Sequence, residues 1–255
     1  MSAALESLWR LAYPEQCVLC GELLELGQRH LCPPCREGLP WVGEHTCPRC
    51  GIAVARDAAT QGGCAACRGQ RLAFRRAVAP FLYEGKVRDL LLEFKLGRRA
   101  SLAYVLGGLL CDYLASGGVS QAVDLVVPVP LHWWRRTGRG FNQATLLALE
   151  IGSRFGLPVA QRLLWRCRAT RSQTSFAGLG RHANVRNAFA VRARRNGSIA
   201  TRLWARLSRQ PDLLARRVLL VDDIFTTGST VNECARTLRE AGAAEVVVAT
   251  VAHTR

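Results

Sequence analysis

Eight cysteines set the strongest constraint on how the first quarter of this chain can fold. They form four C-x-x-C pairs within 51 residues, separated by spacers of 11, 11 and 13 residues. The pairs are Cys17/Cys20, Cys32/Cys35, Cys47/Cys50 and Cys64/Cys67. A C-x-x-C pair places two thiolates on one tight turn, and two such turns complete a tetrahedral Zn2+ site. The segment is therefore predicted to fold around two structural zinc ions.

Two other uses of cysteine pairs fit this segment less well. A disulfide framework requires an oxidising compartment, and the first 15 residues show no basic head and no small-residue cleavage site of a secretion signal. A thioredoxin-like redox centre uses one C-x-x-C pair near a βαβ pattern, whereas four pairs follow one another here. No apolar run approaches the roughly 20 residues of a membrane span. We therefore expect a soluble, cytoplasmic protein that holds zinc.

The residue after each pair indicates how the four pairs combine. The first and third pairs are followed by Gly21 and Gly51, and the second and fourth by Arg36 and Arg68. One unit is thus repeated with a period of about 30 residues, which predicts two consecutive zinc ribbons. The first site would use Cys17, Cys20, Cys32 and Cys35, and the second Cys47, Cys50, Cys64 and Cys67. A crossed combination of the turns is the alternative.

The net charge of +16 is unevenly distributed along the chain. Residues 1–70 hold six arginines and seven acidic residues, whereas residues 131–217 hold 18 arginines and only two acids. A GC-rich genome would explain many arginines, but it does not explain the missing acids. A stretch of this composition should attract polyanions such as phosphates, nucleic acid or acidic lipid head groups.

Residues 71–255 have the pattern of an α/β domain. Short apolar runs bounded by turn residues predict strands, and apolar residues at helical spacing predict the helices between them. Strands are predicted at 77–83, 123–129, 218–221 and 245–251, and helices at 86–95, 100–115, 142–155 and 230–240. The run 218–221 is apolar throughout, which is typical of a parallel strand covered on both faces.

The turn after the predicted strand 218–221 has the residues of a phosphate site. Ligands of open α/β sheets bind beyond the carboxyl ends of the strands, where the next helix begins. Gly228 would let the backbone approach a ligand, and the free amides of a helix start favour an anion. Hydroxyl donors come from Thr226, Thr227, Ser229 and Thr230. Because Asp222 and Asp223 can accept hydrogen bonds from two vicinal hydroxyls, the turn predicts a ribose 5-phosphate ligand. A plain Ser/Thr-capped turn is the alternative.

This turn resembles the 5-phosphoribosyl-1-pyrophosphate (PRPP) motif of type I phosphoribosyltransferases, and the whole chain resembles the ComF family of competence-associated proteins. The family resemblance rests on the four cysteine pairs and on residues 94–99, 127–131, 139–143 and 168–189. It implies an α/β fold: a type I phosphoribosyltransferase-like parallel sheet with helices on both faces, in domain 71–255, preceded by a small double zinc ribbon, in domain 1–70. An Arg-rich insertion near 193–216 departs from the family pattern.

The resemblance also implies roles for the residues of the phosphate turn. Asp222 and Asp223 would be the catalytic acids and would contact the ribose hydroxyls of PRPP. The loop from Thr226 to Thr230 would bind the 5-phosphate. A Mg2+ ion would bridge the diol and the pyrophosphate, because it prefers hard oxygen ligands.

Two further loops are implied to reach the same ligand. The loop 130–140 would face pyrophosphate, because arginine is a fixed, multidentate donor that can stabilise this leaving group. Its arginines are Arg135, Arg136 and Arg139. The span 168–184 resembles the loop that closes over PRPP and excludes water, and a polar connector is the alternative. It contains Arg168, Gln173 and Arg181.

Three functions follow from these features. The first is a phosphoribosyltransferase that displaces pyrophosphate from PRPP and joins an unidentified nitrogen nucleophile to ribose C1. The second, implied by the family, is a DNA-uptake factor that handles single-stranded DNA during transformation, together with proteins of the competence machinery. Trp133, Trp134 and Trp204 are its expected stacking platforms, whereas other aromatic residues of the region, Trp165 among them, are not counted as surface platforms. The third is a PRPP-sensing regulator without turnover.

Overall fold

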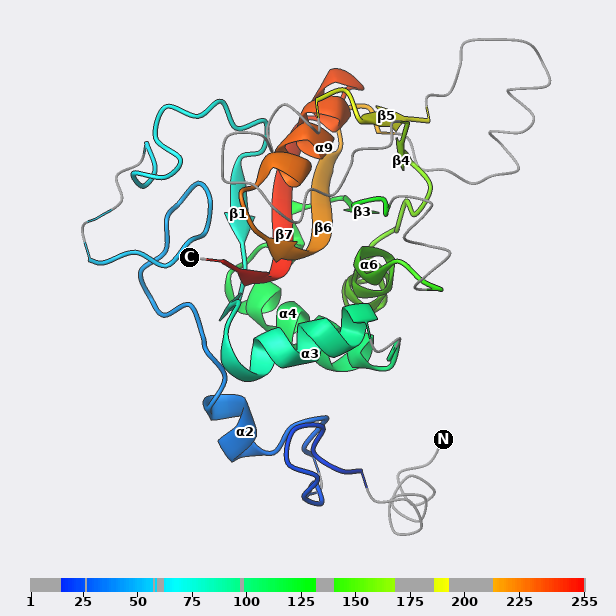
Figure 1. Cartoon of the computed structure of the whole chain (residues 1–255). Helices are drawn as coiled ribbons and strands as arrows, with labels where there is room; N and C mark the ends of the chain where they lie inside the picture. Colours follow the sequence, from blue (N-terminus) through cyan, green and yellow to red (C-terminus); the bar gives the residue numbers. More distant parts are fainter. Residues whose placement is uncertain are drawn as a thin grey trace, which may run out of the picture.

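A parallel sheet forms the centre of the computed structural model, which describes residues 15–25, 27–56, 58, 62–96, 99–131, 140–167, 186–192 and 213–254. Its strands follow the order β1-β7-β6-β3, and β2 pairs with the end of β7 (Figure 1). The strands are β1 (Arg76–Val78), β2 (Phe81–Leu82), β3 (Leu125–Pro128), β6 (Arg217–Phe225) and β7 (Glu245–His253). All of these pairings are parallel, as the apolar runs predicted.

Two strands differ in extent from the runs that predicted them. Strand β6 continues past its apolar run, because β7 pairs with it as far as Phe225 opposite His253. Asp222 and Asp223 therefore lie within the last part of β6 rather than after it. The predicted strand 77–83 is divided into β1 and β2 around Pro80, which has no backbone amide to donate.

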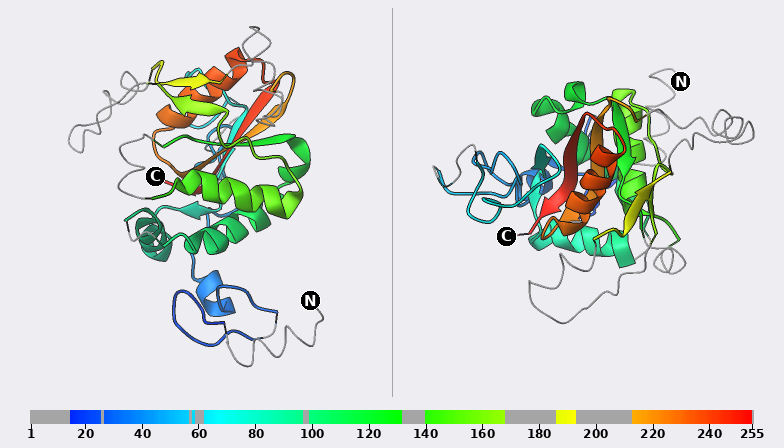
Figure 2. Two further views of the ribbon diagram at one scale, coloured as in Figure 1. Left: turned by 90° about the vertical axis from the view of Figure 1, so that its right-hand side faces the viewer. Right: turned by 90° about the horizontal axis from the view of Figure 1, so that it is seen from above.

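Helices cover both faces of the sheet, which confirms the predicted α/β architecture (Figure 2). They are α3 (Gly85–Leu96), α4 (Leu102–Ser116), α6 (Gln143–Phe155) and α9 (Ser229–Glu240), and a short 3-10 turn, η1 (Ser120–Ala122), precedes β3. Side chains of β6 alternate between two cores, as the pleat of a strand requires. Leu219 and Val221 pack with α3, α4 and α6, whereas Val218 and Leu220 pack with α9. No helix within the described ranges has the length and apolarity needed to cross a membrane.

A separate two-stranded hairpin lies beside α9. Its antiparallel strands are β4 (Leu164–Arg166) and β5 (Phe189–Val191). They flank the span 168–184 that was predicted to close over PRPP. Arg168, Gln173 and Arg181 of that span lie outside the described residues, as does most of the Arg-rich insertion near 193–216.

The two cysteine-rich units pack against different layers of the domain. The first contains α2 (Pro33–Glu37) and joins the core of α3 and α4, where Arg36 forms a 2.7 Å ion pair with Asp112 of α4 (Figure 1). The second joins the core of α9 and lies against β1, because Ala77 N donates a 2.8 Å hydrogen bond to Arg49 O. The predicted division of the chain after residue 70 stays a prediction.

Candidate functional site

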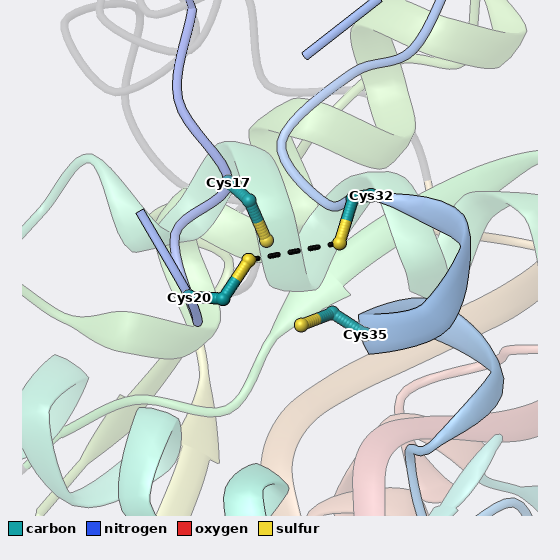
Figure 3. A group of neighbouring side chains, drawn as sticks. All are labelled: Cys17, Cys20, Cys32 and Cys35. Atoms are coloured by element: carbon teal, nitrogen blue, oxygen red, sulfur yellow. Dashed lines mark hydrogen bonds between the residues drawn. The ribbon is translucent and has the colours of Figure 1, made fainter. Parts of the chain in front are cut away.

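Four sulfurs of the first unit point toward one centre (Figure 3). They belong to Cys17, Cys20, Cys32 and Cys35, and all lie within 4.8 Å of one another. The dashed line joins the Sγ atoms of Cys20 and Cys32, which are 3.7 Å apart. Zn–S bonds of about 2.3 Å in a tetrahedron place sulfurs about 3.8 Å apart, whereas a disulfide would bring them to about 2.05 Å. The donor set therefore fits a zinc ion.

The second unit repeats this arrangement with Cys47, Cys50, Cys64 and Cys67, all of them buried. The Sγ atoms of Cys50 and Cys64 are 3.6 Å apart, and those of Cys64 and Cys67 are 3.8 Å apart. These spacings again match a tetrahedral zinc site. The consecutive pairing predicted from the repeat is confirmed, and the crossed pairing is wrong.

Backbone amides prepare one thiol of each unit for metal binding. Burial opposes ionisation of Cys47, but amide donors outweigh it and lower the pKa of this thiol to about 6. One of them is Cys64 N, 3.2 Å from the Cys47 sulfur. The pKa of Cys17 falls to about 6 by the same balance of burial and amide hydrogen bonds. Because zinc binds thiolates, each unit offers its ion a ligand that loses its proton readily.

The predicted phosphate turn connects β6 to α9. Gly228 caps α9 with a positive φ of 73°, a conformation that favours glycine. A Cβ atom at this position would lie 2.6 Å from the ring of Phe225. The hydroxyls of Thr227 and Ser229 are 2.9 Å apart at the helix start. The turn thus combines hydroxyl donors with the free amides of a twelve-residue helix, which suits a phosphate group. Thr226 and Thr230 lie in the same short segment.

The two acids stand just before this turn, and their side chains have different surroundings. Asp223 N donates a 2.9 Å hydrogen bond to Asp222 Oδ1. Burial of the Asp222 carboxyl, followed by the charge of Asp223, raises the pKa of Asp222 to about 7. Asp223 instead forms an ion pair with Lys95, whose Nζ lies 3.0 Å from Oδ1 of the carboxylate.

Lys95 is a site residue whose contact with the acids was not predicted. It lies in the last turn of α3, and its side chain is 21% exposed. The sequence offered one signal, since Lys95 is one of only two lysines in a chain with 35 basic residues. Its charge also lowers the pKa of Asp222, although less than burial raises it.

The start of α6 fixes the neighbouring strand end. Asn142 accepts a 3.2 Å hydrogen bond from Ala144 N at the helix cap, and its Nδ2 donates a 3.0 Å hydrogen bond to Val129 O. Gln143, 1% exposed, donates through Nε2 to Phe94 O at 3.2 Å. These contacts join the ends of β3 and α3 to α6. The predicted pyrophosphate residues Arg135, Arg136 and Arg139 lie outside the described residues.

Comparisons with known proteins match both halves of the chain. Residues 8–71 match the double zinc ribbon domain, and residues 152–255 match the phosphoribosyl transferase domain. Competence protein F of Haemophilus influenzae is 28% identical over 241 residues, which cover 91% of this chain and 94% of that protein. DNA utilization protein YhgH of Escherichia coli K12 is 29% identical over 241 residues, which cover 93% of this chain and 96% of that protein.

One solved structure with a similar fold is the glutamine PRPP amidotransferase of B. subtilis. Its TM-score is 0.36 at 20% sequence identity, and the match covers 62% of this chain but only 30% of that chain. The two domain matches and the end-to-end similarity to competence protein F agree with the sequence and with the geometry. This chain is therefore a ComF-type homologue of competence protein F and YhgH, in which a double zinc ribbon precedes a phosphoribosyltransferase domain.

Proposed function

We propose that this protein binds PRPP together with Mg2+ at the carboxyl end of β6, and that it transfers the phosphoribosyl group to a nitrogen nucleophile. One observation carries the proposal. A pair of adjacent acids and a glycine-capped helix start occupy one strand end, with Lys95 beside them. Ribose hydroxyls require acceptors and a 5-phosphate requires donors, and this strand end offers both within nine residues.

The position of each group suggests its part in binding. The first turn of α9, with Thr227 and Ser229, would hold the 5-phosphate. Asp222 and Asp223, closer to the sheet, would accept hydrogen bonds from the two ribose hydroxyls. The pyrophosphate would then extend toward the end of β3, which adjoins this part of β6 because Val129 N donates to Val221 O at 2.9 Å.

The donor set also fits Mg2+, which prefers carboxylate and phosphate oxygens. Asp223 and Asp222 would hold the ion with the oxygens of PRPP, and Mg2+ would neutralise charge that develops on pyrophosphate. Lys95 already contacts one oxygen of Asp223, so the acids alone offer a crowded place for a cation. We therefore expect Mg2+ to enter with PRPP rather than before it.

In the proposed transfer, the bond between ribose C1 and the pyrophosphate oxygen breaks while a bond from C1 to nitrogen forms. Pyrophosphate leaves with the electron pair of the broken bond, and the nitrogen loses a proton. The binding test is calorimetry with PRPP and Mg2+ on the parent and on an Asp222→Asn, Asp223→Asn variant. Binding by the parent and loss in the variant are expected, and no binding by the parent contradicts the proposal. Binding without pyrophosphate release, with every nitrogen nucleophile offered, would identify a sensor of PRPP.

The relatives favour a cellular role in the use of DNA, since they are named competence protein F and DNA utilization protein. The 18 arginines of residues 131–217 provide the charge for single-stranded DNA. The expected signature is a log affinity that falls with log salt, by about 0.7 for each phosphate neutralised. Affinity that does not change with salt would argue against a role for these arginines.

A further inference from the structure

A cavity of about 490 Å³ lies between the start of α6 and the β4–β5 hairpin. Pro130 and Leu131 close it on the side of β3, so it adjoins the strand next to β6. Among the described residues that line it, none belongs to the phosphate turn. Its volume falls within the range of about 300–1,000 Å³ that is usual for small-molecule sites.

The charge of this cavity is strongly positive. Arg162, Arg166 and Arg192 line it, and the described part of its wall holds no acidic side chain. Neither Arg162 nor Arg192 forms an ion pair with any residue that the structure describes. The N-terminus of the thirteen-residue helix α6 also opens here through its cap, Asn142, and adds partial positive charge. An anion is the ligand that this wall favours.

A second groove of similar size shows that such a charge is not general. It measures about 580 Å³ and lies between the first zinc ribbon and α4. Its Arg36 and Arg154 are paired with Asp112, at 2.7 Å and 3.6 Å. The arginines of the second groove are thus neutralised by the fold, whereas Arg162 and Arg192 are not.

An exposed indole stands beside these guanidinium groups. Trp165 is 42% exposed, although its neighbour Leu164 is buried. On the opposite wall, Phe141 is held by a ring contact with Phe94, with centroids 5.8 Å apart. A flat aromatic surface next to unpaired arginines matches a ligand with a planar ring and a phosphate.

We propose that this cavity is a nucleotide subsite, in which Trp165 stacks on the base while Arg162 and Arg192 bind the phosphate. The ligand is either a free mononucleotide or one nucleotide of a strand, because both present the same chemistry. The subsite goes beyond the PRPP proposal and does not require PRPP binding.

The test measures thymidine 5′-monophosphate by calorimetry and a fluorescent short oligothymidylate by anisotropy. Trp165→Ala and the double variant Arg162→Ser, Arg192→Ser should each weaken binding of the same probe about tenfold or more. Trp165→Phe keeps an aromatic face and should restore part of the affinity. Tyr104→Ala and Arg29→Ser, which change the same kinds of residue in the second groove, should leave the affinity within about twofold.

The outcomes separate this proposal from the PRPP site. Nucleotide that stays bound under saturating PRPP and Mg2+ supports a distinct subsite, whereas displacement by PRPP overturns it. Failure of PRPP to bind contradicts the earlier proposal but leaves the variant comparison intact. Unchanged affinity in both cavity variants, or no binding of either probe to the parent, also overturns the subsite. Tighter binding of oligothymidylate than of the mononucleotide would identify a strand as the source, and equal binding a free nucleotide.

Discussion

The imidazole of His253 stacks on the ring of Phe225, with centroids 4.5 Å apart and planes inclined by 22°. Phe225 ends β6 just before the phosphate turn, and its other edge meets Phe74 at 6.2 Å in a T-shaped contact. Phe74 and Phe225 share a core with the four cysteines of the second zinc ribbon. The second ribbon therefore supports the phosphate turn through a continuous set of packed rings.

This packing predicts different consequences for the loss of each zinc. Cys50→Ser should remove the second ion and weaken PRPP binding about tenfold or more, because the ring contacts lose their support. Cys20→Ser should remove the first ion and leave PRPP affinity within about twofold, since that ribbon packs on α4. Zinc content by mass spectrometry and PRPP affinity by calorimetry measure both effects. The parent should hold two ions per chain, and an equal loss of affinity in the two variants would contradict the ring pathway.

Gly228→Ala should abolish PRPP binding. The reason differs from the one the sequence suggests, which was that a side chain would fill the space of the phosphate. In the structure an added Cβ meets the Phe225 ring at 2.6 Å, at a φ of 73° that alanine rarely adopts. The strained backbone alone should lower the free energy of unfolding by about 1 kcal/mol.

Gly156→Ala is the matched control for this prediction. Gly156 has a similar φ of 65°, but nothing lies within 4 Å of its added Cβ. Urea unfolding should show a similar loss of stability in both variants, and calorimetry a loss of PRPP binding only at Gly228. Normal PRPP affinity in Gly228→Ala would place the ligand elsewhere.

What could be predicted from the sequence follows the range of each interaction. The zinc pairing depends on a local repeat, and the buried strands depend on short apolar runs, so both follow from nearby residues. The contact between Lys95 and Asp223 joins the end of α3 to the end of β6, which no local pattern encodes. Trp165 was not counted as a surface platform, yet it is exposed, because an apolar side chain on a short edge hairpin can face a cavity.

Lys95→Met should weaken PRPP binding, because it removes the positive charge beside two acids and an anionic ligand. Lys95→Arg keeps the charge and should restore part of the affinity. The other lysine of the chain, Lys86, is exposed at the opposite end of α3, so Lys86→Met is the control and should bind PRPP as the parent does. Calorimetry with Mg2+ measures all three variants. Equal affinities of Lys95→Met and Lys86→Met would leave Lys95 without a part in the site.

The Asp222 carboxyl should make the protein less stable as the pH rises. Burial and the charge of Asp223 raise its pKa from 3.8 in the unfolded chain to about 7 in the folded one. Between these values the folded state holds a proton that the unfolded state has released, so the free energy of unfolding falls as the pH increases from about 4 to about 7. Asp222→Asn removes this titration and should flatten that part of the profile, with a gain in stability over the parent at about pH 8. Urea unfolding of parent and variant across this range measures the effect, and parallel profiles would show that Asp222 has an ordinary pKa in the folded protein.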